Sequence, residues 1–338
     1  MNLPTAILTI RWMTWDTFRQ ARAWGILWLM LGVSLLCTVF CLSATVHGDQ
    51  PLQHPGEPTE FLPRNDPLAK NTAKLNKQGV DLVQGELRLA FGAVRLPQGR
   101  DAEDSVRFLQ LILAGGVADA LGLLLCLIWT AGFLPTFLEP AAAGVLLSKP
   151  LPRWWLLAGK YVGVLAFVGF QGIIFVGGTW AALGITTGMW IPEYLLCIPL
   201  LLVHFAVMYS VSVLLAVCTR NTVACVFGSI LFWLLCWGLN YGRHMLVTLP
   251  SLSPEAAAFP PAFQGLVDTL YWILPKPADF SIILQNALHA SDHFGTVPVF
   301  SKVQEVGAFY PELSVLSSLG FAVILIATAA RQLVATDY

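Results

Sequence analysis

Two ionisable side chains lie inside long apolar stretches of the chain and are the first candidates for chemistry. Asp119 lies near the middle of the apolar run 109–134, and His204 lies within the run 194–217. An acid at the centre of a membrane helix costs about 2.5 to 3.5 kcal/mol on insertion scales, so it must face the helix bundle, a partner or water. We therefore treat Asp119 as a substrate-pathway candidate, with a packing role as the alternative, and expect His204 to be a hydrogen-bonded packing residue.

A histidine pair offers the nearest approach to a metal site. His289 and His293 have the i, i+4 spacing that lets two imidazoles share one ion on a helix, with Asp292 beside them. The pair lacks a third ligand and lies in a polar segment, which favours ordinary loop histidines. The sequence therefore predicts no metal site, and it offers no catalytic or cofactor-binding residue.

The motif by which a chain binds ATP itself is missing from the sequence. No Gly-x-x-x-x-Gly-Lys-Ser/Thr occurs, and the pair Gly159-Lys160 is followed by Tyr161 without the upstream glycine. No Gly-x-Ser-x-Gly nucleophile elbow occurs either. We expect the chain not to be an enzyme, so any ATP and Mg would be held by a partner subunit.

The composition is that of a membrane protein. Hydrophobic residues make up 56% of the 338 residues and charged residues only 12%, whereas soluble domains average roughly 25% charged. The net charge of −1 gives no reason to expect a nucleic-acid partner. A bilayer core needs about 20 apolar residues in a helix. Six segments fit, namely 24–46, 109–134, 161–186, 194–217, 222–240 and 313–330.

This pattern predicts an all-α integral membrane fold of six transmembrane helices, with a small extracytoplasmic α/β insertion between spans one and two. Lys and Arg gather in 1–23 and in 135–160, and none lies in the turn 187–193. By the positive-inside rule both termini are expected to be cytoplasmic. We expect the membrane to be a plasma (inner) membrane. The segment 1–23 is expected to form an interfacial helix, because Trp12, Trp15 and Phe18 share one side.

Two longer segments, 47–108 and 241–312, are expected outside the cytoplasm. The first half of 47–108 is rich in proline, and its second half, 86–96, alternates with period two about Gly92, which predicts a small β element. In 241–312 we expect short helices on the outer membrane surface, with Tyr271 and Trp272 as interface anchors.

The cytoplasmic loop 135–160 between the second and third spans is the most informative stretch. Glu139 followed by proline is typical of a helix start, with the acid at the positive end of the helix dipole. A short helix is predicted over 141–148, ended by Pro150 and Pro152. The loop should therefore hold a short helix rigidly between two spans, a shape suited to receiving a push from a partner.

This loop resembles that of the membrane subunit of type-2 ATP-binding-cassette (ABC-2 type) transporters. The likeness consists of an acid, a small-residue helix, the run Leu-Ser-Lys-Pro-x-Pro-Arg at 147–153 and a Gly-Lys pair before the third span, about 25 residues in all, and the six-span order agrees. The resemblance implies a coupling helix that docks on a separate ABC-type ATPase subunit, and a second permease copy or homologue. It assigns the contact, or its shaping, to Glu139, Gly144, Lys149, Pro150, Arg153 and Lys160. Positive-inside placement alone would also explain Lys149 and Arg153.

The expected function is that of a permease subunit of an ATP-driven ABC transporter, an exporter that alternates between two states. Two other classes stay open. A non-transporting membrane anchor or assembly scaffold would work through its outer loops and would not need a stiff cytoplasmic loop. A membrane-embedded enzyme would need a polar cluster on adjacent spans.

Glycines at 159 and 163, and at 184 and 188, permit close helix contact.

Overall fold

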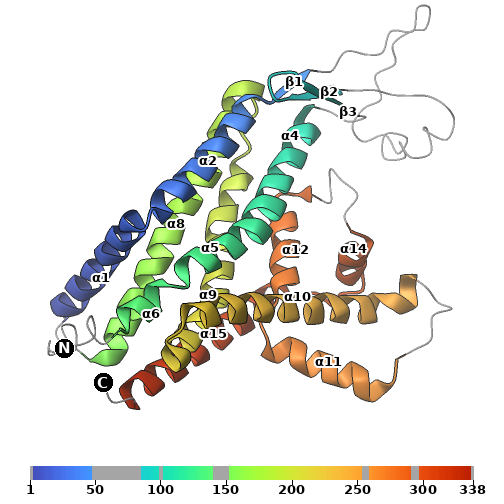
Figure 1. Ribbon diagram of the computed structural model, residues 1–338. Helices are drawn as coiled ribbons and strands as arrows, with labels where there is room; N and C mark the ends of the chain where they lie inside the picture. The colour runs from blue at the N-terminus through green and yellow to red at the C-terminus, as the bar shows by residue number, and fades with distance from the viewer. Residues whose placement is uncertain are drawn as a thin grey trace, which may run out of the picture.

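The computed structural model of the protein describes residues 3–47, 85–98, 102–139, 152–252, 259–290 and 297–335. It is 85% helical with almost no sheet, which confirms the predicted all-α membrane fold. Within the described residues, five helices are long and apolar enough to cross a membrane, and a bent helix pair at the N-terminus makes a sixth candidate (Figure 1). The protein is therefore an integral membrane protein built as a helix bundle.

The chain begins with two helices that meet at a sharp bend. Helices α1 (Leu3–Ala23) and α2 (Ile26–Leu42) are bent by 77°. Gly25, at the junction, has φ +74°, a left-handed conformation that glycine adopts without steric cost. Trp12 and Trp15 on α1 are exposed. That α1 lies in the membrane interface stays a prediction.

The second span carries an irregular stretch at its centre. It runs over Ser105–Phe137 and joins α4 (Ala102–Leu111), the π-helix η2 (Ile112–Gly122), α5 (Leu123–Thr130) and α6 (Phe133–Phe137). π-Helical hydrogen bonding, i to i+5, is rare and is frequent at functional sites. It changes which side chains face inward, and Asp119 is buried here together with Leu113 and Ala114.

The remaining long helices surround the most buried one. They are α8 (Arg153–Thr187), α9 (Cys197–Thr219, preceded by η3, Pro192–Leu196), α10 (Thr222–Leu252) and α15 (Pro311–Ala335). Helix α9 packs against α8, α10 and α15. Helix α10 extends past Asn240, where we predicted the fifth span to end. Asn240 and His244 do not end the helix because both side chains are buried and hydrogen-bonded.

The described residues between α10 and α15 include three short helices, namely α11 (Pro261–Ile273), α12 (Pro277–Ala287) and α14 (Pro298–Glu305). Each begins with proline at its first position, where the missing N–H costs nothing. They are too short to cross a bilayer, and the turn between α11 and α12 is buried at Lys276. The expected role as an interface anchor is wrong for Tyr271, which is buried and donates its hydroxyl to the Asp279 carboxylate. Trp272 is 40% exposed.

A small antiparallel sheet closes the end of the bundle opposite both chain termini (Figure 1). Its order is β1 (Thr45–His47), β2 (Gly85–Leu89) and β3 (Val94–Gln98). The β2–β3 turn has positive φ at Ala90, Phe91 and Gly92. The hairpin therefore lies where the period-two pattern about Gly92 predicts it. The proline-rich half of 47–108 lies outside the described residues.

Candidate functional site

Asp119 has two side-chain partners from distant parts of the chain. His204 Nδ1 on α9 lies 2.7 Å from its Oδ1, and the Ser281 hydroxyl on α12 donates to its Oδ2 at 2.9 Å. Asp119 is 6% exposed and His204 1% exposed. Both residues were singled out in the sequence, and the structure brings them together, with Ser281 as a third member that the sequence did not indicate.

Only one of the two ring nitrogens of His204 has a hydrogen-bond partner among the described residues. Its ring stacks on Phe280 of α12, with centroids 4.9 Å apart and planes at 6°. Its Nδ1 points to Asp119, whereas the buried Nε2 has no hydrogen-bond partner among the described residues. A buried nitrogen without a partner carries the desolvation cost of an unmade hydrogen bond. His204 is thus oriented by a carboxylate and keeps one nitrogen unused.

A second buried carboxylate, Asp279, lies at the start of α12 and is fully buried. Its Oδ1 accepts hydrogen bonds from Asn240 Nδ2 (2.9 Å) and His244 Nε2 (2.6 Å) on α10. Its Oδ2 accepts from the Tyr271 hydroxyl (2.7 Å) on α11 and the Ser314 hydroxyl on α15. Four donors from three helices thus converge on one carboxylate.

These donors decide the charge state of the carboxyl. Burial by itself would raise the pKa of Asp279, but the hydrogen bonds from His244, Ser314 and Tyr271, with the charge of His244, outweigh it and hold the pKa below its ordinary value. Lys276, three residues earlier, is fully buried, and burial lowers its pKa to about 8 although Asp279 opposes the shift. Its ammonium donates to the Ser317 hydroxyl at 2.6 Å.

Helix α12 connects the two carboxylates. Asp279, Phe280 and Ser281 are consecutive: the first accepts the four donors, the second stacks on His204 and the third donates to Asp119. A movement of α12 would therefore disturb contacts with η2, α9, α10, α11 and α15 at once. We call the side chains of Asp119, His204, Ser281, Asp279, His244, Asn240, Tyr271 and Ser314 the buried polar cluster.

A membrane-embedded enzyme would need polar side chains gathered on adjacent elements, and the buried polar cluster is such a group. The order in which its Ser, Asp and His are hydrogen-bonded, however, is not that of a serine hydrolase. Ser281 donates to the carboxylate of Asp119, and the histidine lies on the carboxylate's other oxygen. The imidazole therefore does not receive the serine proton, as nucleophilic catalysis by a Ser-His-Asp triad requires. What the geometry can do is exchange a proton within an Asp–His pair and tie α12 to the spans.

No group of three or more His, Cys, Asp or Glu side chains that could hold a metal occurs among the described residues. Helix α12 ends at Ala287, and His289 has a left-handed φ of 53°. The helical i, i+4 geometry considered for His289 and His293 therefore does not begin at His289. His293 lies outside the described residues.

Of the six candidate coupling residues, three lie outside the described residues and three lie within them. Gly144, Lys149 and Pro150, with the helix expected at 141–148, lie outside the described residues. Glu139 follows α6, and Arg153 is the first residue of α8, so these two bracket the segment.

Lys160 is placed inside the bundle. It is 1% exposed, and its Nζ donates to Asp16 Oδ2 (2.9 Å) and Gln20 Oε1 (2.8 Å) of α1. One turn on, Gly163 is so close to α1 that a Cβ there would lie 3.1 Å from the Met13 carbonyl oxygen and 3.2 Å from Thr14 Cα. The close contact expected at Gly163 is therefore confirmed. Lys160 binds α1 and can only shape a partner contact.

Asp279, His244, Asn240 and Lys276 were missed by the sequence reasoning, which placed them in or at the edge of a polar outer segment. A signal was available on α10, where Asn240 and His244 are four residues apart and so share a helix face. The run Pro275-Lys-Pro277 followed by Asp279 marks a tight turn with charges, but nothing local shows that it is buried.

A scan against models of known protein families finds no match for the chain, and a search of curated proteins finds no similar sequence. A functional assignment must therefore come from the residues and geometry described above.

Proposed function

We propose that this chain is the permease subunit of an ATP-driven ABC-2 type transporter, an exporter in the plasma (inner) membrane with both termini in the cytoplasm. In this proposal a separate ABC-type ATPase subunit docks on the coupling segment, which we define as residues 139–153. Two permease copies, or this chain and a homologue, alternate between two states. ATP and Mg are bound by the partner alone.

The observation that carries the proposal is the attachment of the coupling segment to α8. Helix α8 begins at Arg153, the last residue of the segment, and is unbroken for 35 residues. At about 1.5 Å per residue it is about 52 Å long, well beyond the roughly 30 Å of a bilayer core. A displacement of the coupling segment would therefore move a rigid element that reaches the far side of the membrane.

The position of the segment in the bundle supports this reading. The end of α6 and the start of α8, which flank it, lie at the end of the bundle that also holds both chain termini (Figure 1). Helix α1 is fixed to α8 through Lys160, Asp16 and Gln20 close to the segment. A push on the segment would be shared by α1 and α8.

Asp119 remains the candidate for a role in transport. Its carboxylate joins η2, α9 and α12, and α12 reaches α10, α11 and α15 through Asp279. A transporter needs an interior element with two arrangements of similar energy. We infer that the buried polar cluster is that element, because its hydrogen bonds can be exchanged among neighbours without exposing a charge to lipid.

Co-purification tests the proposal. The tagged chain is extracted from its native membranes in mild detergent, and bound proteins are identified by mass spectrometry. We expect a P-loop ATPase with the wild type and its loss with Lys149→Glu/Arg153→Glu. The matched control, Arg19→Glu/Arg331→Glu, makes the same change in charge at the same end of the bundle and should retain the ATPase. Absence of an ATPase from the wild type would contradict the proposal.

A further inference from the structure

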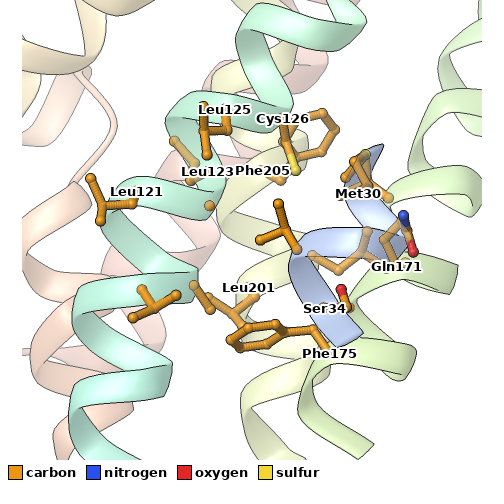
Figure 2. A pocket seen from close by; sticks show the side chains of 18 of the residues that line it. Met30, Ser34, Leu121, Leu123, Leu125, Cys126, Gln171, Phe175, Leu201 and Phe205 are labelled. Atoms are coloured by element: carbon orange, nitrogen blue, oxygen red, sulfur yellow. The ribbon is translucent and has the colours of Figure 1, made fainter. Parts of the chain in front are cut away.

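An apolar cavity of about 270 Å³ lies between α2, η2, α5, α8 and α9 (Figure 2). This volume is close to the lower bound of roughly 300 Å³ for small-molecule sites. Aliphatic and aromatic side chains form nearly the whole lining, among them Met30, Leu123, Val168, Phe175 and Phe205. The cavity lies outside the buried polar cluster, so neither the transport proposal nor the cluster accounts for it.

One polar side chain in the lining has no partner. Gln171 of α8 is 4% exposed, and neither its Oε1 nor its Nε2 makes a hydrogen bond within the described residues. Figure 2 shows its amide among the lining side chains near Met30 and Ser34. A buried amide is normally paired, because an unmade bond there costs its full desolvation. The other side chains of the described lining that carry a polar hydrogen are Ser34, Cys126 and Trp129.

The cavity opens toward the lipid-facing surface. Val33 (42% exposed), Leu121 (60%) and Leu125 (37%) belong both to its lining and to the outer face of the bundle. These residues lie on membrane helices, whose exposed apolar side chains contact hydrocarbon. A ligand would therefore enter from the bilayer and be largely apolar itself.

We propose that this cavity binds the hydrocarbon chain of a membrane amphiphile whose polar group both donates and accepts hydrogen bonds, as an amide does, with Gln171 as its partner. Oε1 and Nε2 of Gln171, which are unpaired within the described residues and covered by neighbouring atoms, form a donor–acceptor pair that an amide matches with two parallel bonds when a ligand displaces that cover. An ester, which only accepts, satisfies half of it. The inference goes beyond the transport proposal and does not depend on an ATPase.

The test uses a long-chain primary fatty amide with a photoactivatable diazirine on its chain. The full chain, alone in lipid nanodiscs, is irradiated with the probe, and labelled peptides are mapped by mass spectrometry. We expect labelling of the α2 and α8 peptides that hold Met30 and Gln171, stronger than with the matching methyl ester. Gln171→Leu should reduce it about thirtyfold, the value of two net hydrogen bonds.

A second variant fills the cavity without touching the amide. Gly172 lines the cavity, and a Cβ there meets no atom within 4 Å, so Gly172→Leu should fit and reduce labelling at least as strongly. Two controls should label like the wild type. Gly177→Leu is on the same helix, in equally open space but outside the cavity, and Gln110→Leu removes another buried amide that has no hydrogen-bond partner among the described residues.

Equal labelling of Gln171→Leu, Gly172→Leu and the wild type would overturn the site, as would labels spread evenly over all lipid-facing helices. The variants are compared by size-exclusion profile and melting temperature. Gln171→Leu should melt no lower than the wild type, because it removes a buried group that has no partner. If the wild type labels no more strongly with the amide than with the ester, or if Gln171→Leu keeps the preference for the amide, the assignment of the amide group is wrong.

Discussion

Asp119 of η2 and His204 of α9 are 85 residues apart in the sequence, yet Oδ1 of the first lies 2.7 Å from Nδ1 of the second inside the membrane bundle. Ser281 completes the contact from α12. The carboxylate, which is 6% exposed, thus holds three elements together.

Removing that carboxylate should destabilise the fold. Asp119→Leu leaves His204 and Ser281 without their common acceptor, and we expect a loss of about 2–4 kcal/mol, seen as a lower melting temperature in detergent. Asp119→Asn retains one carbonyl oxygen and should lose less than half as much. Equal melting temperatures for Asp119→Leu and the wild type would show that the contact does not hold the bundle together.

Asp119→Asn should separate assembly from turnover. The variant is expected to express and to co-purify with the ATPase as the wild type does, because the coupling segment is untouched. Its transport, once a substrate is found, should fall by at least tenfold, because the neutral amide cannot exchange a proton with His204. Transport at the wild-type rate would remove Asp119 from the pathway.

Lys276 should make stability depend on pH. Its pKa is about 8 in the folded protein, against an ordinary value of about 10.4. Between these values the unfolded state binds more protons, so stability rises with pH, by about 2 kcal/mol between pH 7.5 and 9.5. Asp279 does not contribute to the change of stability between pH 7.5 and 9.5. Its pKa is lowered, so the stability it provides is lost only when the pH falls into the acid range.

The variant Lys276→Met should lack this slope, because it has no ammonium to desolvate. Melting temperatures of both proteins at several pH values in one detergent check the difference. Parallel curves for the variant and the wild type would contradict the assignment of the slope to Lys276.

Gly163 should be intolerant of any side chain. The backbone of α1 is so near that Gly163→Leu must push α1 away from α8 and break the Lys160–Asp16 contact. We expect faster proteolysis after Arg19 and Arg22, and a lower melting temperature. Gly177→Leu, on the same helix in open space, is the control and should resemble the wild type in both assays.

The sequence indicated the helices and the hairpin because each depends on a local pattern. Apolar runs of about 20 residues give the spans, and the alternation about Gly92 gives the β2–β3 hairpin. The end of α10 was misplaced because Asn240 is polar, and polarity alone does not show that Asp279 satisfies it.

The site was only half predictable for the same physical reason. The cost of an acid in a membrane helix singled out Asp119, and burial in an apolar run singled out His204. Their contact, and the four donors on Asp279, depend on how α9, α10, α12 and α15 pack, which no local pattern records. The partners of Lys160 belong to this class too, because Asp16 and Gln20 are about 140 residues away.

The most direct test of the permease proposal is photocrosslinking in native membranes. A benzoylphenylalanine at position 144 or 149, inside the coupling segment, should crosslink to a protein that carries a Gly-x-x-x-x-Gly-Lys-Ser/Thr motif. The same group at Phe91, an 82% exposed residue in the turn between β2 and β3, should not, because that sheet lies at the opposite end of the bundle (Figure 1). Crosslinks from 144 and 149 only to lipid, or to proteins without that motif, would contradict the proposal that an ATPase drives this protein.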